Sequence, residues 1–318
     1  MKISRRQFVK AMAVMSAASM LAACGGNSGS GSSGGKKALT FQIWDVAQKE
    51  GMEAMCAAYT QQHPEVSIEV QVTSWNEYWT KLEAAATSNQ MPDIFWMHTN
   101  EILKYADNGM LADCSDIVEK DKFSEISLSN AMGSNGTLYA VPKDKDTVGL
   151  VYNKEMFDAA GVAYPDENWT WDDLVSASEK IYAATGKYGY MAYADDQLGY
   201  WNFVYQAGGY ILNEDKTKAG FTQPATEKAM KFYIGLQQND WCPDQTYFAE
   251  TAPGTAFFSE KGAMFLEGDW NILAELQNYP EMVGKWDVAV LPKCPDPESG
   301  DGRATISNGL CYATAASN

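Results

Sequence analysis

The sequence predicts an α/β protein that consists of two α/β units, and three observations support this fold class. About 295 residues follow an N-terminal leader, which is enough for two domains that each bury a core. Over residues 39–109, apolar strand patterns alternate with helical patterns, the order that builds a parallel sheet covered by helices. The alternation starts again at residue 154, which indicates a second unit.

The first unit contains three predicted strands, each followed by a helix. Pro64 ends the first helix, Ser74 and Glu77 form the S-x-x-E pattern of a capping box, and Gly109 closes the last helix. Ligands of such sheets bind at the carboxyl ends of the strands, so the residues that follow each strand are site candidates. The predicted strands are 39–46, 67–73 and 94–97, and the predicted helices are 48–62, 74–86 and 99–108.

The second unit follows a turn at Asn135-Gly136 and a pair of strands that flank residues 143–147. Gly161 lies behind its first helix, and Thr170 begins the next. The predicted strands of this part are 138–142, 148–153, 188–193, 263–267 and 287–291, and the predicted helices are 154–160, 170–184, 197–207, 226–238 and 271–276.

The charge of the chain excludes several classes of partner. The formal net charge is −17, and four cations lie in the leader, so the remainder carries about −21. Such a surface repels phosphates, and we expect no nucleic-acid partner. Arg303 is the only arginine beyond the leader. Because arginine is the preferred partner of carboxylate and phosphate groups, an anionic ligand is disfavoured.

Histidine and cysteine are equally limiting. His63 and His98 are the only histidines, and the sequence has no HExxH, no phosphate-binding loop and no dinucleotide-binding glycine motif. We therefore expect neither a metal nor a cofactor. Five cysteines follow Cys24, and most are expected to be small buried residues. A single disulfide, for which Cys294 and Cys311 are the candidates, stays open.

The leader has the features of an export signal. A basic segment, Met1–Lys10, precedes a short apolar segment, Ala11–Ala22. Leu21-Ala22-Ala23-Cys24 resembles the bacterial lipobox, which implies a signal peptide over 1–23 and a lipidated Cys24 on a Gly/Ser tether over 24–38. The protein would then be anchored at the outer face of the cytoplasmic membrane, extracellular or periplasmic. The alternative is an ordinary signal peptide with an incidental cysteine.

The export route has two interpretations. Ser4–Lys10 contains the arginine pair of a twin-arginine signal, which would carry the protein out already folded. A merely basic segment that uses the general export route satisfies the same pattern, so both routes stay open.

Five stretches, in their order, carry a resemblance to a known family. From about Leu39 to Asn318 the chain is similar to the extracellular solute-binding proteins (family 1) of bacterial carbohydrate ABC importers, which include the maltodextrin-binding proteins. The stretches are 91–96 (MPDIFW), 108–113 (NGMLAD), 136–142 (GTLYAVP), 151–154 (VYNK) and 263–270 (AMFLEGDW).

The resemblance implies a two-lobed periplasmic-binding-protein-like fold with a hinge and a ligand cleft between the lobes. The expected division is lobe 1 over 39–146, lobe 2 over 147–291 and a return to lobe 1 over 292–318. The first crossing is placed at Lys143–Thr147 and the return near Leu291. Family members continue into further helices, so the chain is expected to be truncated at its C-terminal end.

The function implied by the resemblance is capture, not catalysis. A sugar or oligosaccharide would bridge both lobes, hinge closure would trap it, and a monomeric carrier would deliver it to the permease subunits of an ABC transporter. Two alternatives stay open. The same fold could bind a polyamine or another non-sugar solute through carboxylates and cation–π contacts, or paired carboxylates could form a surface glycosidase.

A sugar offers hydroxyl groups, which need directional hydrogen-bond partners, and C–H faces, which suit aromatic rings. Carboxylates supply hydrogen bonds of about 1.5–3 kcal/mol to such groups. Trp270 matches the stacking tryptophan of the family's second lobe. Asp146 matches a hinge carboxylate that binds sugar hydroxyl groups, and the alternative is that Asp146 is only an exposed charge at the hinge. The expected ligand contacts are Trp44, Asp45, Gln48, Lys49, Trp75, Trp96, Thr99, Asn100, Asp146, Asp196, Trp201 and Trp270.

Each of the remaining contacts follows a predicted strand or matches a family aromatic. Trp96 matches the family's cleft tryptophan, and Trp201 another aromatic near the cleft, with Asp196 upstream. Thr99 and Asn100 stand where a maltodextrin binder has charged contacts, which suggests a different glycan. The others follow the first two strands: Trp44, Asp45, Gln48, Lys49 and Trp75.

Several conspicuous residues have a structural interpretation instead. A catalytic triad would have to use His98 or His63. His98, which lies beside Trp96 in the sequence, is instead expected to make a hydrogen bond at the cleft floor. Glu77 is expected to be a helix-capping partner. The tryptophans assigned to packing are Trp169, Trp171, Trp241 and Trp286.

Overall fold

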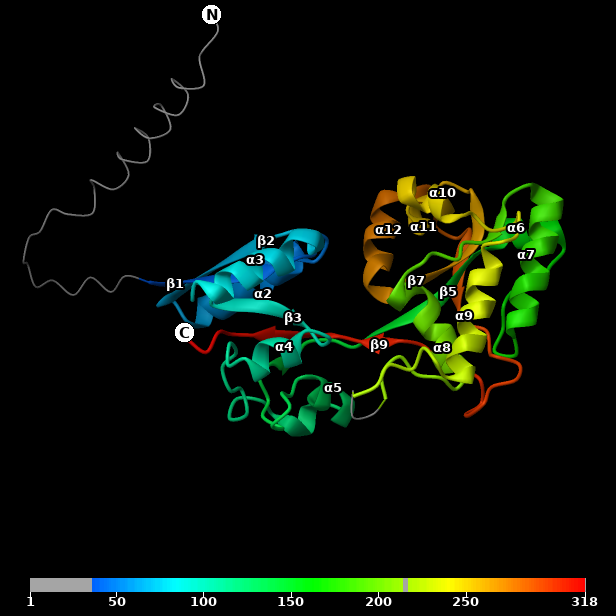
Figure 1. The fold of residues 1–318 in the computed structure, drawn as a ribbon. Coiled ribbons are helices and arrows are strands. Elements are labelled where there is room, and N and C mark those ends of the chain that lie inside the picture. Colours follow the sequence, from blue (N-terminus) through cyan, green and yellow to red (C-terminus); the bar gives the residue numbers. More distant parts are fainter. Residues whose placement is uncertain (1–35, 214–216, 318) are drawn as a thin grey trace, which may run out of the picture.

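Two separate β-sheets organise the chain, and two strands that run from one sheet to the other join them (Figure 1). The computed structural model describes residues 36–213 and 217–317. The predicted signal peptide, Cys24 and the tether up to residue 35 lie outside the described residues. The α/β two-lobed fold expected from the sequence is confirmed.

The sheet of lobe 1 has the order β2-β1-β3-β10-β4. Strand β1 pairs in parallel with β2 and β3, as the strand–helix alternation predicts, whereas β10 is antiparallel to both β3 and β4. Strand β10, which starts at Leu310, therefore completes a sheet whose first strand lies about 270 residues earlier in the chain. The bounds are β1 Lys37–Ile43, β2 Val66–Val72, β3 Ile94–His98, β4 Val141–Pro142 and β10 Leu310–Ala313.

Helices cover both faces of this sheet, and each face has a buried cluster. Tyr78, Tyr105 and Phe95 belong to the larger cluster, and Phe41 and Trp96 to the smaller one. The helix bounds are α2 Lys49–Gln62, α3 Trp75–Thr87, α4 Ile102–Asp107, η1 Lys120–Lys122 and α5 Glu125–Asn130.

The sheet of lobe 2 has the order β6-β7-β5-β8. Strand β5 is central, and both of its neighbours within this sheet, β7 and β8, are antiparallel to it. All seven residues of β7 are buried, which makes its run GAMFLEG the best-shielded strand of the lobe. The bounds are β5 Asp146–Asn153, β6 Tyr188–Tyr190, β7 Gly262–Gly268 and β8 Trp286–Ala289.

The helices of lobe 2 begin at the signals that the sequence carries. Thr170 and Asp173 form a capping box at α7, Gly186 ends that helix in the left-handed conformation, and Pro224 and Pro253 occupy the first turns of α9 and α11. The bounds are α6 Lys154–Ala160, α7 Trp171–Thr185, η2 Asp196–Tyr200, α8 Trp201–Gln206, α9 Pro224–Leu236, α10 Gln245–Glu250, α11 Pro253–Phe258, η3 Asp269–Asn271, α12 Ile272–Asn278 and η4 Pro280–Met282.

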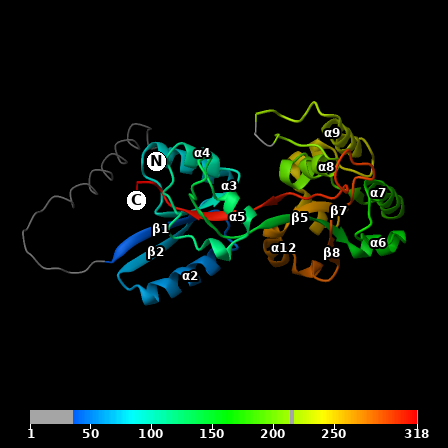
Figure 2. The same cartoon turned by 90° about the horizontal axis from the view of Figure 1, so that it is seen from below.

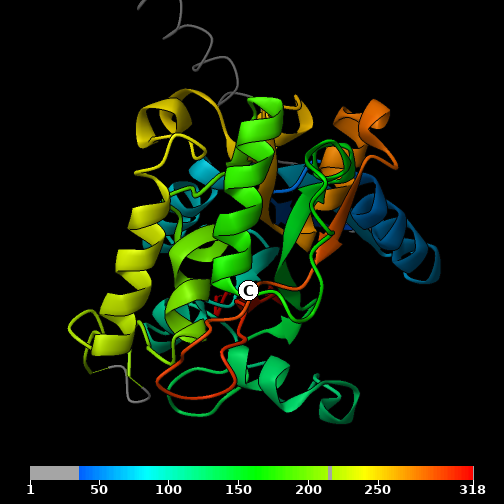
Figure 3. The same ribbon diagram turned by 90° about the vertical axis from the view of Figure 1, so that its right-hand side faces the viewer.

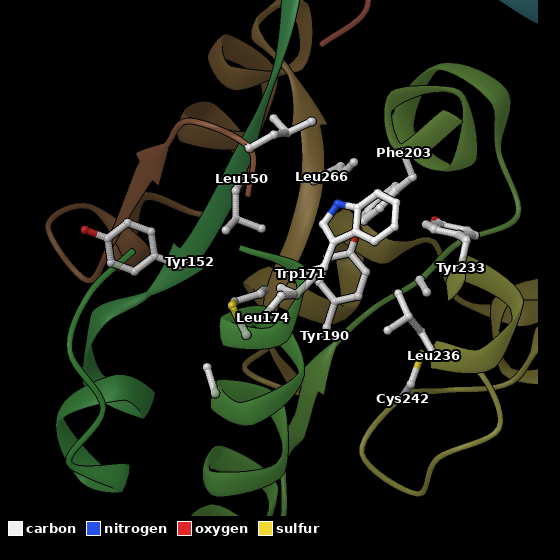
Figure 4. Packing of buried hydrophobic residues seen from close by; sticks show 14 of the residues in the cluster. Leu150, Tyr152, Trp171, Leu174, Tyr190, Phe203, Tyr233, Leu236, Cys242 and Leu266 are labelled. Carbon is white, nitrogen blue, oxygen red and sulfur yellow. The ribbon is translucent and has the colours of Figure 1, made fainter. Parts of the chain in front are cut away.

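The core of lobe 2 is built around Trp171 at the start of α7 (Figure 4). Its ring stacks on Phe232 at 4.4 Å between centroids and packs against Phe203 at 5.5 Å. Its indole Nε1 donates a 2.7 Å hydrogen bond to Oε1 of the buried Gln206. In the end-on view, α7 (bright green) covers the outer side of the lobe (Figure 3). The expectation that Trp171 packs in a core is therefore confirmed.

The hinge consists of the first residues of β5 and a short strand, β9 (Ser307–Asn308), which pairs with it. Asp146 lies opposite Asn308, and Thr147 opposite Ser307, in an antiparallel arrangement. The view from below shows these two segments side by side between the lobes (Figure 2). Strand β5 begins at Asp146, within the range Lys143–Thr147 predicted for the first crossing.

The return to lobe 1 lies at Ser307–Asn308 and not near Leu291. Residues 292–306 stay on lobe 2, where the Lys293 backbone bonds to Trp169 and Trp171, and Arg303 donates to the Leu291 carbonyl. The Gln206 amide also holds the Ala304 carbonyl at 2.9 Å. Strand propensity could not locate this return because residues 292–306 contain no strand of their own.

Two further expectations need correction. The helix predicted over 197–207 is split into a π-helical turn, η2, and α8, because Gly199 departs from helical dihedral angles. The candidate disulfide does not form. Cys294 is buried in the core of lobe 2 and Cys311 in the core of lobe 1, and all five described cysteines are free and buried.

Replacing Trp171 by alanine should lower the free energy of unfolding by about 3–5 kcal/mol, because it leaves a cavity beside Phe232 and removes the donor to the buried Oε1 of Gln206. Urea unfolding followed by fluorescence measures the change. Tyr182→Ala on the exposed side of the same helix is the matched control, with an expected loss below about 1 kcal/mol. Equal losses in the two variants would contradict the assignment of Trp171 to the core.

Candidate functional site

A cavity of about 520 Å³ lies between the lobes and is lined by both. Its walls come from the segment after β1, the start of α3 and the end of β3 in lobe 1, from the hinge, and from η2, η3 and α12 in lobe 2. The lining residues are Trp44, Asp45, Gln48, Trp75, His98, Asp144, Asp146, Asp195, Gln197, Leu198, Asp269, Trp270, Asn271, Ala274, Asn308 and Leu310.

A second hollow of about 420 Å³ adjoins this cavity and shares Gln197 and Asn308 with it. It lies between Asn100, which follows β3, and the aromatic side chains of Trp201 and Tyr205 on α8. Residues 304–308, which lead into the hinge and include β9, form the rest of its lining. The two hollows together make an elongated space between the lobes.

The structure brings six of the twelve predicted contacts together in the main cavity: Trp44, Asp45, Gln48, Trp75, Asp146 and Trp270. Asn100 and Trp201 line the second hollow, and Thr99 lines a small recess beside the hinge. Lys49, Trp96 and Asp196 line none of these spaces.

These last three residues have other roles in this structure. Trp96 has no exposed surface and lies in the core under Trp44, so it offers no ring face to a solute. Lys49 points to Glu53 one turn along α2 and forms an exposed ion pair. Asp196 accepts the backbone N–H of Gln197, and its neighbour Asp195 lines the cavity in its place.

The aromatic wall of lobe 1 depends on Trp44. Its ring lies edge-on to Trp75 at 5.1 Å, to Tyr78 at 4.9 Å and to the buried Trp96 at 5.1 Å. Such edge-to-face pairs hold a ring in a fixed orientation. Trp75 is 42% exposed and presents apolar surface to the cavity. Lobe 1 therefore offers a rigid aromatic surface at the ends of its first two strands.

Trp270 supplies the aromatic wall of lobe 2, directly after β7. Its ring folds over Gly268, where a Cβ would lie 2.3 Å from the indole atoms. Below it, the carboxyl group of Glu267 accepts the N–H of Gly268 and the amide of Asn271, both at 2.8 Å. Glu267 is 6% exposed, and burial raises its pKa to about 7. The sequence Glu-Gly-Asp-Trp-Asn thus positions Trp270 through its neighbours.

Polar side chains that contact one another cross the cleft floor. The Asn308 amide, in the hinge, lies 3.3 Å from Nε2 of His98 in lobe 1 and also contacts the Gln197 side chain in lobe 2. His98 Nδ1 accepts the N–H of Asn100 at 3.2 Å. Burial lowers the pKa of His98 to about 4, so the ring is neutral at physiological pH. The expected hydrogen bond of His98 at the cleft floor is present.

Five carboxylates line the main cavity: Asp45, Asp144, Asp146, Asp195 and Asp269. Burial, together with the negative charges of Asp144 and Asp269, raises the pKa of Asp146 to about 7. Within residues 36–213 and 217–317, no three His, Cys, Asp or Glu side chains are arranged to hold a metal ion.

Several lining residues were not predicted from the sequence, although local patterns point to some of them. Asp144 and Asp146 alternate in the hinge segment KDKD, a period of two that places both side chains on one side of a strand. Asp269 directly precedes Trp270. No local pattern indicated Asn308, because its position depends on β9 pairing with β5. The other missed residues are Asp195, Gln197, Leu198, Asn271, Ala274 and Leu310.

The described helices include none that is both long enough and apolar enough to cross a lipid bilayer.

Comparison with known proteins identifies the family to which the sequence is similar and the solved structures that share its fold. The family model of the bacterial extracellular solute-binding proteins matches residues 44–310. A lactose-binding protein of Rhizobium radiobacter is 26% identical over 267 residues, which are 80% of this chain and 61% of that protein. An arabinooligosaccharide-binding protein of Bacillus subtilis is 26% identical over 304 residues, which are 90% of this chain and 67% of that protein. The chain thus spans about two thirds of the length of these relatives, or somewhat less.

Solved structures agree with this result. An ABC substrate-binding protein of Listeria monocytogenes, in complex with cycloalternan, superposes with a TM-score of 0.76 at 25% identity, covering 88% of this chain and 71% of that one. A solute-binding protein of Thermotoga lettingae bound to α-D-tagatose gives a TM-score of 0.75 at 25% identity, covering 89% and 74%.

Replacing Glu267 by glutamine should flatten the pH dependence of stability. The folded-state pKa of about 7 lies above the ordinary value of 4.5, so the stabilising contribution is complete below about pH 4.5 and is lost as the pH rises through 7. At pH 8 the variant should be more stable than the parent by about 1–3 kcal/mol, since glutamine keeps the oxygen that accepts the two hydrogen bonds.

Urea unfolding between pH 4.5 and pH 8 measures this difference. The exposed Glu281 of the same lobe gives the control variant Glu281→Gln, whose curve should follow the parent's. A Glu267→Gln protein that is less stable than the parent at pH 8 would contradict the prediction.

Proposed function

Because this chain belongs to the bacterial extracellular solute-binding protein family, we propose that it captures a sugar or oligosaccharide between its lobes and passes it to the permease of an ABC transporter. The family consists of solute-binding proteins rather than enzymes, which removes the glycosidase alternative. The relatives named above are described as binding lactose, arabinooligosaccharides and cycloalternan, and these names favour a carbohydrate.

The observation that carries the proposal is an aromatic surface on each lobe of one cavity. Trp44 and Trp75 line it from lobe 1, and Trp270 lines it from lobe 2. Aromatic rings pack against the C–H faces of sugars, while carboxylates and amides around them accept and donate hydrogen bonds to hydroxyl groups. A solute that touches both surfaces is bound by both lobes at once.

Closure about the hinge follows from this division of contacts. Only a closed arrangement completes both sets of contacts, so the solute shifts the equilibrium toward it. Asp146 and Asn308 belong to the hinge pair and also line the cavity. A solute bound to these residues therefore acts directly on the strands that bend.

The size of the space supports a ligand of more than one sugar ring. The two hollows of about 520 and 420 Å³ join at Gln197 and Asn308, and each has its own aromatic side chains. A linear oligosaccharide could place one ring on Trp270 and the next toward Trp201. A single monosaccharide would leave one hollow empty.

A second candidate, a polyamine, is supported by one observation. The five carboxylates and three tryptophans of the main cavity are groups that attract ammonium ions. The carbohydrate proposal is preferred because the uncharged second hollow, with Trp201 and Tyr205, suits a sugar ring better than an extended cation.

The placement of the protein in the cell is part of the proposal. Its family is extracellular, and the predicted lipobox and tether would hold the lobes beside the membrane that contains the permease. Whether the chain crosses that membrane folded or unfolded depends on which interpretation of the Ser4–Lys10 signal applies.

A thermal-shift screen of the protein without its leader, against mono- and oligosaccharides with spermidine and amino acids alongside, tests the carbohydrate proposal. A ligand that binds only the folded state raises the melting temperature as its concentration exceeds Kd. We expect a shift with one glycan, and we expect Trp270→Ala to reduce the affinity for it at least about tenfold.

The exposed Tyr59 on α2, outside the cavity, gives the control Tyr59→Ala, which should keep the parent's shift. A shift with spermidine alone would replace the carbohydrate by a polyamine. A glycan shift that Trp270→Ala leaves intact would move the site elsewhere.

Expression of the full chain in a bacterial host tests the anchor. Cys24 is the predicted lipidation site, so the parent protein should sediment with membranes and partition into detergent, and Cys24→Ser should abolish both. Cys56→Ser, which changes a buried cysteine within lobe 1, should leave the partition unchanged. Retention of Cys24→Ser in the detergent phase would argue against lipidation.

A further inference from the structure

The main cavity carries an imbalance of charge that a neutral sugar does not explain. Five of its sixteen lining residues are aspartates, and within the described residues no lysine or arginine lines it. Its one histidine, His98, is neutral. The carboxylates come from both lobes and the hinge, so closure brings their charges together.

Lys143 is the one ammonium group in contact with a cavity carboxylate in the described residues, and it is already engaged. It forms an ion pair with Asp144, donates to Gln48 at 3.1 Å and lies 4.7 Å from the ring centre of Trp96. Lys145 is exposed and lines the recess that Thr99 also lines. Among the residues that the structure describes, the other four carboxylates of the cavity thus have no cationic partner.

The hydrogen bonds of these four carboxylates differ. Asp45 accepts the Gln48 side chain at 2.9 Å, Asp195 accepts the N–H of Leu198 at 2.7 Å, and Asp269 accepts the N–H of Thr147 at 3.2 Å. In the described part of the chain, the Asp146 carboxyl group has neither a hydrogen bond nor an ion pair. Among these four acids, Asp146 is therefore the one whose carboxyl group has the fewest hydrogen-bond and charge partners.

Enclosing a solute removes water from these carboxylates. A buried carboxylate without a compensating cation or donor is unfavourable, and the neighbouring charges of Asp144 and Asp269 add to this cost at Asp146. The pKa of Asp146 is raised to about 7 by its burial first and by these neighbouring charges second. A solute that brings its own positive charge would relieve it.

The second hollow differs in charge from the main cavity. It contains no acidic or basic residue, and Trp201 and Tyr205 form its aromatic side. Asn308 stands between the two spaces and is 6% exposed, with its Oδ1 buried and without a hydrogen-bond partner. One end of the elongated space is therefore acidic and the other is neutral and aromatic.

We propose that the solute is an aminated glycan, held with its ammonium group at Asp146 and Asp269 and with a neutral sugar ring toward Trp201. This inference rests on the proposed function of the same cavity. An ammonium group has three donors and no acceptor, which matches an unsatisfied carboxylate. Trp270, next to Asp269, adds a ring face that attracts the cation.

Isothermal titration with glycans matched in all but one group tests the proposal. The series contains the β-1,4 dimer of glucosamine, its hydroxyl counterpart cellobiose and its N-acetylated counterpart, with the corresponding 6-amino and 6-hydroxy dimers as a second set. At pH 6.5 in 20 mM salt, we expect at least one aminated glycan to bind about 10- to 100-fold more tightly than both counterparts. Its affinity should fall several-fold in 500 mM salt, and that of the neutral glycans should hardly change.

Asp146→Asn should lower the ratio of the two affinities, aminated glycan over neutral counterpart, by about tenfold or more. Asp240→Asn, which changes an exposed aspartate of lobe 2 outside the cavity, is the matched control and should retain the preference. The melting temperature of each variant without ligand shows that it is folded.

The outcomes separate this inference from the proposed function. A neutral glycan that binds as tightly as its aminated counterpart, or a preference that Asp146→Asn preserves, overturns the inference and leaves the sugar carrier standing. Binding of spermidine without any glycan overturns both the aminated glycan and the carbohydrate proposal. An aminated preference lost in Asp146→Asn and kept in Asp240→Asn supports it.

Discussion

The pairing of β5 with β9 is the constraint on which the rest of the structure depends. Two pairs of residues, Asp146 with Asn308 and Thr147 with Ser307, form the ladder between the lobes. On either side the chain enters a sheet at once, because β5 continues as the central strand of lobe 2 and β10 follows β9 after the single residue Gly309. A Cβ at that glycine would lie 2.5 Å from the Asp144 carbonyl, so the hinge strands approach as closely as they do only with glycine there.

The lobes behave as rigid supports for the residues at their facing edges. In lobe 2 the fully buried Asn202 holds both sides of this edge: its amide donates to the Gln197 carbonyl at 2.7 Å, and its oxygen accepts the N–H of Ile306 at 2.8 Å. In lobe 1 the edge-to-face rings around Trp44 do the same by packing. The surfaces that line the cavity are therefore positioned by buried contacts, and the proposed closure of the lobes would deform the hinge alone.

Much of this arrangement follows from the order of residues along the chain. The capping signal at Thr170 placed the start of α7 correctly, and the alternation of apolar residues located the parallel strands of lobe 1. The family resemblance identified Trp270 and Asp146, which line the cavity. It also selected Trp96, whose ring is fully buried, because a motif specifies position along the strand and not which of its two faces meets solvent.

The sequence by itself determined the fold class, the absence of anion-binding arginines and the excess of acid, since these depend on composition and local periodicity. Only the tertiary structure decided which acids share one cavity, that Asn308 joins His98 to Gln197, and that residues 292–306 stay on lobe 2. These contacts join residues that lie roughly one hundred or more positions apart in the sequence, and no local pattern encodes them. They exist because burial and strand pairing, which act through space, bring residues 146–147 and 307–308 together in one hinge.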